Sequence, residues 1–164
     1  MGKLEELKQR YPKRTDTVAG RPFSYRYHQN PQSDITVVLL TGGIGLSDLM
    51  LFHFEEFAKS CSVITFDYPE CFPSVRELVD AAAQLLRSLN VKVFLIGQSL
   101  GGFFAQVLAK RHPEVVSGLV LSNTGTLSVE MEPQGEQSLR DMLKRADRLL
   151  LLLKILPFGL VRGI

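Results

Sequence analysis

Residues 91–111 read VKVFLIGQSLGGFFAQVLAKR, an apolar run followed by a glycine-rich turn and an amphipathic run. The first six residues predict a buried strand, and the run from Leu100 predicts a helix. Between them lies a G-x-S-x-G motif, in which Gly97 and Gly101 let strand and helix approach closely on either side of Ser99. A serine in this strand–turn–helix setting is typical of a nucleophile elbow, so Ser99 is the candidate catalytic nucleophile.

The position of Ser99 ahead of a helix also suits acyl-transfer chemistry. The positive end of the helix dipole and the free amides of the first turn favour the negative charge of a tetrahedral intermediate. The alternative is a plain glycine-rich turn in which Ser99 serves only as the N-cap of the helix.

An earlier apolar run, residues 35–40, predicts a second buried strand that leads into TGGIG at residues 41–45, here called the glycine loop. An oxyanion hole needs two converging backbone N–H groups, because such donors are fixed in place before the reaction. One donor is expected from Leu100, the residue after the nucleophile, and the other from the glycine loop, most plausibly from Gly43.

The glycine loop has two other interpretations: a simple turn or a loop that cradles phosphate. Gly42 and Gly45 lack the third glycine of a G-x-G-x-x-G dinucleotide motif. Asp67 follows the next predicted strand, so dinucleotide binding stays open as a weaker alternative.

The expected elements alternate along the chain, which predicts an α/β fold with a mainly parallel sheet and helices on both faces. A hairpin is expected around Ala19-Gly20, and its second strand is expected at an edge of the sheet, where it ends at His28. The expected strands are 35–40, 62–67, 91–96 and 115–122, and the expected helices are about 46–60, 73–89 and 100–111.

This pattern resembles the N-terminal half of an α/β-hydrolase over about residues 15–125, with the elbow as its most specific part. The stretch GQSLGGFFAQ at 97–106, together with Tyr68-Pro69 and Pro157-Phe158, is similar to maspardin-type members of that superfamily. Many α/β-hydrolases begin the oxyanion loop with His-Gly. This chain has Thr41 before the first glycine, which puts the geometry of the loop in doubt.

A serine nucleophile needs a base, and the base needs an anionic group to orient it. The resemblance implies the chain order serine, acid, histidine, yet the only histidine after Ser99 is His112 at the far end of the same helix. A helix rise of 1.5 Å per residue puts it nearly 20 Å away, so His112 is interpreted as part of a helix stop. His53 is expected to be a packed or half-exposed helix residue, and nothing in the sequence supports a catalytic role for His28.

The acid is missing as well. Asn123 follows the strand after the elbow helix, where some hydrolases place their carboxylate, and an amide cannot carry that charge. Solvated surface positions are expected for the later acids, Glu130, Glu132, Glu136, Asp141 and Asp147. We therefore expect residues 1–128 to form an incomplete hydrolase core, and residues 129–164 to begin a helical cap in a truncated hydrolase.

Composition excludes several other classes of protein. With 45% hydrophobic and 22% charged residues the chain should fold, and a net charge of +2 is too weak for nucleic-acid binding. We expect no transmembrane segment, no cofactor and no metal site, and a cytoplasmic protein whose Cys61 and Cys71 stay reduced.

Two functions remain. The first is a serine hydrolase of ester, thioester or amide bonds, whose base and acid lie outside this sequence. The second is a non-catalytic binding or scaffold protein on a hydrolase frame, which the maspardin likeness favours. The exposed edge of strand 115–122 is expected to allow dimer formation.

Overall fold

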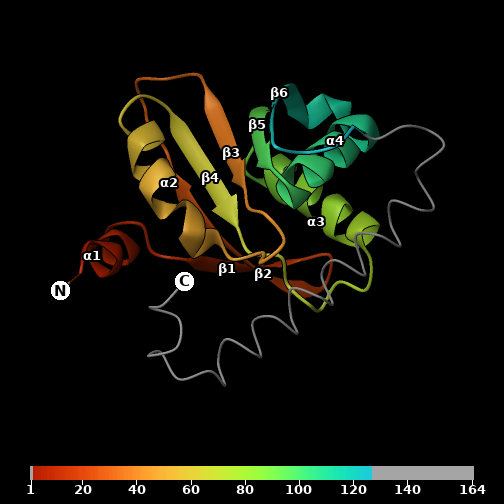
Figure 1. The fold of residues 1–164 in the computed structure, drawn as a ribbon, viewed down its shortest axis with the longest axis horizontal. Helices are drawn as coiled ribbons and strands as arrows, with labels where there is room; N and C mark the ends of the chain where they lie inside the picture. Colours follow the sequence, from red (N-terminus) through yellow and green to blue (C-terminus); the bar gives the residue numbers. More distant parts are fainter. Residues whose placement is uncertain (1, 127–164) are drawn as a thin grey trace, which may run out of the picture. The chain divides into compact units, whose positions relative to one another are not determined.

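The computed structural model describes residues 2–126. Six strands form one sheet in the order β1-β2-β4-β3-β5-β6 (Figure 1). The strands are β1 (Arg14–Val18), β2 (Arg21–His28), β3 (Thr36–Leu40), β4 (Ser62–Phe66), β5 (Val93–Gln98) and β6 (Val116–Ser122). The helices are α1 (Lys3–Arg10), α2 (Leu51–Ala58), α3 (Val75–Ser88) and α4 (Leu100–Arg111), with short 3₁₀ helices η1 (Ser47–Met50) and η2 (Pro113–Val115).

The sheet is mixed but mostly parallel. β1 and β2 form an antiparallel hairpin across Ala19 and Gly20, which both have positive φ, and β2 then pairs antiparallel with β4. The pairs β3–β4, β3–β5 and β5–β6 are parallel. Helical connections join the parallel strands, since a parallel pair needs a crossover. The predicted α/β class is confirmed.

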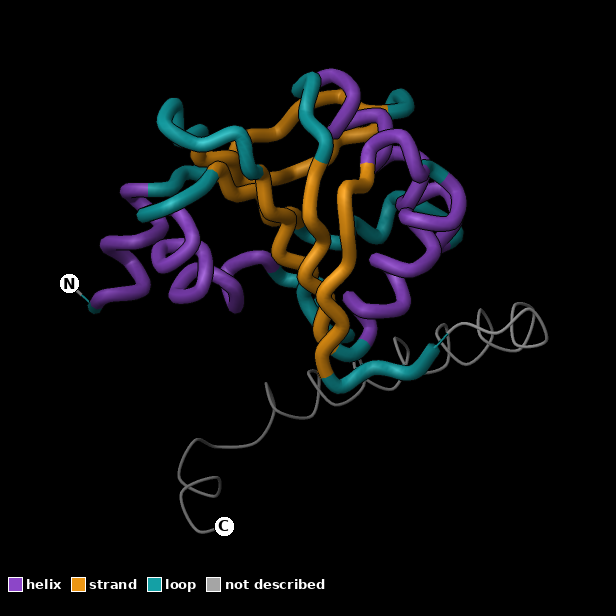
Figure 2. Tube along the Cα trace, turned by 90° about the horizontal axis from the view of Figure 1, so that it is seen from above, coloured by secondary structure: helices purple, strands orange, loops and turns teal. Residues whose placement is uncertain are grey.

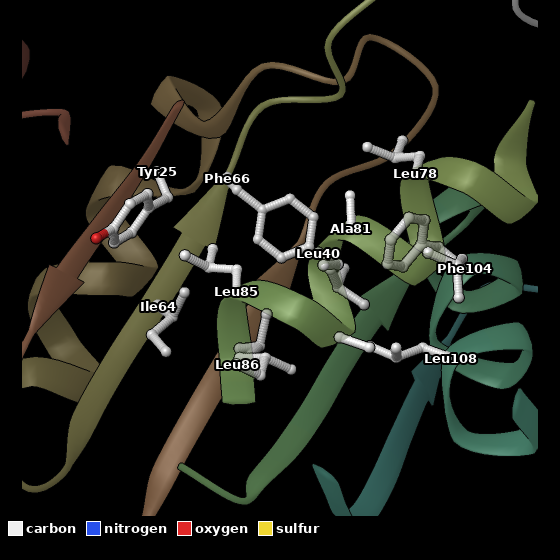
Figure 3. Packing of buried hydrophobic residues seen from close by; sticks show 14 of the residues in the cluster. Tyr25, Leu40, Ile64, Phe66, Leu78, Ala81, Leu85, Leu86, Phe104 and Leu108 are labelled. Carbon is white, nitrogen blue, oxygen red and sulfur yellow. The ribbon is translucent and has the colours of Figure 1, made fainter. Parts of the chain in front are cut away.

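Helices cover both faces of the sheet (Figure 2). Because side chains alternate along a strand, Val38 and Leu40 of β3 pack with the α3 and α4 side, whereas Val37 and Leu39 pack with α2. The larger cluster includes Phe66, which lies between strand and helix side chains (Figure 3). This core fixes the strands whose carboxyl ends carry the candidate site.

The helix α3 shows how the sequence specifies one of these layers. The Ser74 side chain accepts a hydrogen bond from the Glu77 backbone N–H at 3.2 Å and caps the helix. Leu78, Ala81 and Leu85 recur at helical spacing and are buried against the sheet (Figure 3).

Some predicted boundaries differ from the structure. The helix expected over 46–60 begins as the 3₁₀ helix η1 and continues as α2 only to Ala58. The strand expected over 91–96 is β5, which starts at Val93 and runs on through Gly97 to Gln98. The prediction that His28 ends an edge strand is wrong, because β2 lies between β1 and β4.

The predicted cap segment, residues 129–164, and the five acids named in it lie outside the described residues. Within residues 2–126 no helix is long and apolar enough to cross a bilayer. In the same part of the chain, Cys61 is a buried free thiol and Cys71 an exposed one.

Candidate active site

Ser99 is the residue at which β5 ends and α4 begins. Its backbone has φ 53° and ψ −118°, a region that non-glycine residues rarely adopt. The Ser99 N–H donates to the carbonyl of Ser122 at 3.1 Å. Its own carbonyl accepts from the Gly102 N–H at 3.0 Å and from the Thr124 hydroxyl at 2.7 Å. These bonds hold the strained turn in place, and such strain persists only where the surrounding structure fixes it.

The two motif glycines are required by close backbone contacts. A Cβ on Gly97 would lie 2.4 Å from the carbonyl oxygen of Gly101, on the first turn of α4. A Cβ on Gly101 would lie 2.5 Å from the carbonyl oxygens of both Leu40 and Thr41. The elbow therefore packs backbone against backbone, and the carboxyl end of β3 lies against the first turn of α4.

The glycine loop lies next to Ser99. A Cβ on Gly42 would be 3.8 Å from the Ser99 Cβ, in ordinary van der Waals contact, whereas a Cβ on Gly43 would meet nothing within 4 Å. Gly45 has φ 66° and closes the loop through a 3.1 Å hydrogen bond from its N–H to the Gly42 carbonyl. The fold thus brings together the glycine loop and the G-x-S-x-G turn, as predicted from the sequence.

Two backbone donors remain available at this point. Within residues 2–126 no hydrogen bond uses the N–H of Gly43 or that of Leu100. The Leu100 N–H belongs to the first turn of α4, where helix amides have no intrahelical acceptor and the dipole favours an anion. Leu100 buries its side chain, and Ser99 is only partly buried.

Carboxylates near the loop are engaged in structural contacts. The Asp67 Oδ1 accepts from the N–H and the hydroxyl of Ser47, at 2.8 and 2.7 Å, and the Lys13 ammonium lies 2.8 Å from Oδ2. Asp67 therefore anchors η1 instead of facing a ribose, which removes the support for dinucleotide binding.

Asp48 belongs to the same group of charges. Burial raises the pKa of its carboxyl, but hydrogen bonds from Arg26 and Lys13 outweigh this effect and lower the pKa to about 2. The Arg26 guanidinium is buried, donates to Asp48 at 2.6 Å, and also donates to the Tyr11 carbonyl.

Within the described residues, no hydrogen bond or ion pair joins any of the three histidines to Ser99. His112 is the C-cap of α4, as predicted, and its Nε2 lies 2.6 Å from Asp80 Oδ1 while its Nδ1 lies 2.8 Å from an Arg87 nitrogen. His53 is exposed on α2, and the His28 ring lies edge-on to the Tyr11 ring, with centroids 5.7 Å apart. These histidines have structural roles or face solvent.

One backbone feature and two hydrogen bonds of this site were not foreseen from the sequence. Asn123, the residue after β6, has a positive φ of 48° and is exposed. The next residue, Thr124, bonds the Ser99 carbonyl, and the Tyr68 hydroxyl bonds the Thr41 carbonyl at 2.8 Å. The Tyr68-Pro69 pair is a sequence signal for the Tyr68 contact, but it is recognisable only through a family likeness.

Comparison with known proteins identifies the family to which this architecture belongs. A family model described as the alpha/beta hydrolase fold matches residues 35–151, which include both the glycine loop and the elbow. The chain belongs to the α/β-hydrolase family. The mostly parallel sheet and the strand–turn–helix at Ser99 are those of an α/β-hydrolase, and solved structures of the family superimpose on most of the chain.

The relatives of this α/β-hydrolase include proteins named for different reactions. It is 45% identical over 51 residues to a candidate carbamate hydrolase, RutD, from Serratia proteamaculans, over 30% of this chain and 19% of that protein. A candidate lipase from Acinetobacter baumannii superimposes with a TM-score of 0.67 at 21% identity, over 77% of this chain and 46% of that one. A bacterial membrane phospholipase A gives a TM-score of 0.65 at 20% identity, over 76% and 45%. The chain spans less than half the length of these relatives.

Proposed function

We propose that Ser99 is the nucleophile of a serine hydrolase that acts on a small-molecule ester, thioester or amide. The observation that supports this most directly is the Ser99 backbone at φ 53° between β5 and α4, with the glycine loop beside it. A turn of this kind lifts the serine hydroxyl clear of the sheet at the carboxyl ends of the strands.

The proposed reaction proceeds through an acyl-enzyme. The Ser99 oxygen would attack the substrate carbonyl carbon, and its proton would pass to a base and then to the leaving group. The N–H groups of Gly43 and Leu100 would bind the oxyanion of the tetrahedral intermediate. A water molecule would then give a proton to the same base and add to the acyl carbon, and as the acid is released the base would pass that proton to the Ser99 oxygen.

The base and the acid that orients it would come from outside residues 2–126. Within that range each histidine and each carboxylate near the loop has another contact or faces solvent. The relatives are named as a carbamate hydrolase, a lipase and a phospholipase, so carbamates and lipid esters are the first candidate substrates to screen. The proposed location of the protein is the cytoplasm.

Labelling with a fluorophosphonate probe tests the proposal. The wild-type chain should be labelled at Ser99, slowly, because an oxyanion hole without its base still gives about 10³–10⁴-fold acceleration over background. Ser99→Ala should lose the label. Ser117→Ala, which changes an exposed serine on β6, should keep it. Equal labelling of Ser99→Ala and wild type would exclude Ser99, whereas fast labelling at neutral pH would reveal a base within this chain.

A binding or scaffold protein on a hydrolase frame is the second candidate. It is favoured by the absence, within residues 2–126, of a histidine hydrogen-bonded to Ser99. A folded wild-type chain that resists the probe yet binds a protein partner would support this candidate, and with it the likeness to maspardin-type proteins.

A further inference from the structure

The dipeptide Asp67-Tyr68, directly after β4, holds the glycine loop at two positions and the first residue of η1 at a third. The Tyr68 hydroxyl donates to the Thr41 carbonyl at 2.8 Å, and the Tyr68 N–H donates to the Gly45 carbonyl at 2.8 Å. The Asp67 carboxylate accepts two hydrogen bonds from Ser47. These contacts lie on both sides of the candidate oxyanion donor in the loop.

Tyr68 also contacts the elbow helix. Its ring stacks on that of Phe104 in α4, with centroids 5.4 Å apart and an interplanar angle of 7°. A Cβ on Gly45 would lie 3.0 Å from the Tyr68 Cβ, so the loop packs directly on this side chain. One residue therefore touches both the glycine loop and the helix whose first turn carries Leu100.

The Tyr68 hydroxyl is suited to a fixed role. Burial raises its pKa well above the usual tyrosine value, so it remains a neutral donor throughout the physiological range. Its acceptor, the Thr41 carbonyl, belongs to the residue that stands where many family members have histidine. Among residues 2–126, the hydrogen bond of the Thr41 hydroxyl is a long one, 3.3 Å to the Gly42 carbonyl. The stronger side-chain hold on this end of the loop comes from Tyr68.

We propose that Tyr68 is a positioning residue that fixes the Gly43 N–H relative to Ser99 and to the Leu100 N–H. The inference rests on the proposed serine-hydrolase function, in which those two amides bind an oxyanion. An oxyanion hole works because its donors are ordered before the reaction, and an error of about 1 Å in such a site can reduce the rate about 100-fold.

The test compares two tyrosine variants of the same chain. Tyr68→Phe keeps the ring that stacks on Phe104 and removes only the hydroxyl. Tyr25→Phe removes another hydroxyl from a buried residue, one that donates to Asp16 at 2.7 Å on the β1–β2 hairpin. For each protein, fluorophosphonate labelling of Ser99 is resolved into a maximal rate and a half-saturating probe concentration, and unfolding is followed in parallel.

Tyr68→Phe should lower the maximal labelling rate by about 10- to 100-fold and leave the half-saturating concentration unchanged. Tyr25→Phe should stay within about twofold of wild type. Labelling of Tyr68→Phe at the wild-type rate would overturn the inference. Slowing of both variants in proportion to their loss of stability would also overturn it, because that result reports general loosening of the fold.

A second measurement does not depend on serine chemistry. The Gly45 N–H donates to the Gly42 carbonyl, and the Ser47 N–H donates to the Asp67 carboxylate. Hydrogen exchange at these two amides should accelerate in Tyr68→Phe and not in Tyr25→Phe. Absence of label on the wild-type chain would contradict the proposed function and the catalytic part of this inference. Unchanged exchange in Tyr68→Phe would contradict the ordering of the loop by Tyr68, whatever the labelling shows.

Discussion

Gly101 lies directly against the backbone of Leu40: a Cβ built on Gly101 would be 2.5 Å from the Leu40 carbonyl oxygen. Real Cβ atoms essentially never come that close to another heavy atom, and this neighbour is backbone in a central strand. The start of α4 and the end of β3 are therefore seated together only because Gly101 has no side chain.

Gly101→Ala should destabilise the fold. The added methyl must push α4 away from β3, and overpacking of this kind costs typically about 1–3 kcal/mol. Gly43→Ala is the matched control, because a Cβ there meets nothing within 4 Å and no positive φ opposes it. Denaturant unfolding followed by circular dichroism measures both variants. Equal stability of the two would show that the elbow and β3 are not in close contact.

Gly43→Pro should abolish most labelling of Ser99 while the fold survives. Proline has no backbone N–H, so this change removes the proposed oxyanion donor, and loss of one such donor costs about 10²–10³ in rate. Gly43→Ala keeps the N–H and should be labelled at close to the wild-type rate. If the proline variant reacts as fast as the alanine variant, the second donor is elsewhere, for instance at Gly42 or Ile44.

Local features of the site could be predicted from the sequence. The strand, the tight turn at Ser99 and the helix α4 follow each other within some twenty residues, so periodicity and glycine spacing were sufficient to locate them. The glycine loop was found in the same way, from the apolar strand ahead of it.

Contacts between segments could not be predicted. The hold of Tyr68 on Thr41 depends on β3 and β4 being neighbours, and the pairing of His112 with Asp80 depends on α3 packing beside α4. The local sequence pattern of one segment does not show which other segment will lie beside it. The wrong prediction that β2 is an edge strand has the same origin, because the alternation of its side chains does not show that β4 pairs with it on the side opposite β1.

Stability should fall in acid through Asp48. Its pKa is lowered from 3.8 to about 2 in the folded protein, so its ion pairs stabilise the fold fully above pH 3.8 and are lost as the pH falls through about 2. At neutral pH, Asp48→Asn should cost about 1.5–3 kcal/mol, because it weakens a charged hydrogen bond to the buried Arg26.

Thermal unfolding of wild type and Asp48→Asn between pH 7 and pH 2 measures this effect. The gap in stability between the two proteins should be constant above pH 4 and should narrow toward pH 2. A gap that stays constant down to pH 2 would mean that the Asp48 carboxylate contributes nothing through its charge.

Self-association should occur through β6, which within residues 2–126 pairs only with β5. Leu119, Val120 and Leu121 are each 40% or more exposed along this strand, and an exposed apolar edge offers unpaired backbone groups to a second copy. Val120→Lys puts a charge on the edge and should shift the chain toward monomer in sedimentation velocity at micromolar concentration. Ile35→Lys is the matched control, since Ile35 is 50% exposed ahead of β3, and it should associate like wild type. A wild-type chain that sediments as a clean monomer and unfolds in one cooperative transition would contradict association through this edge.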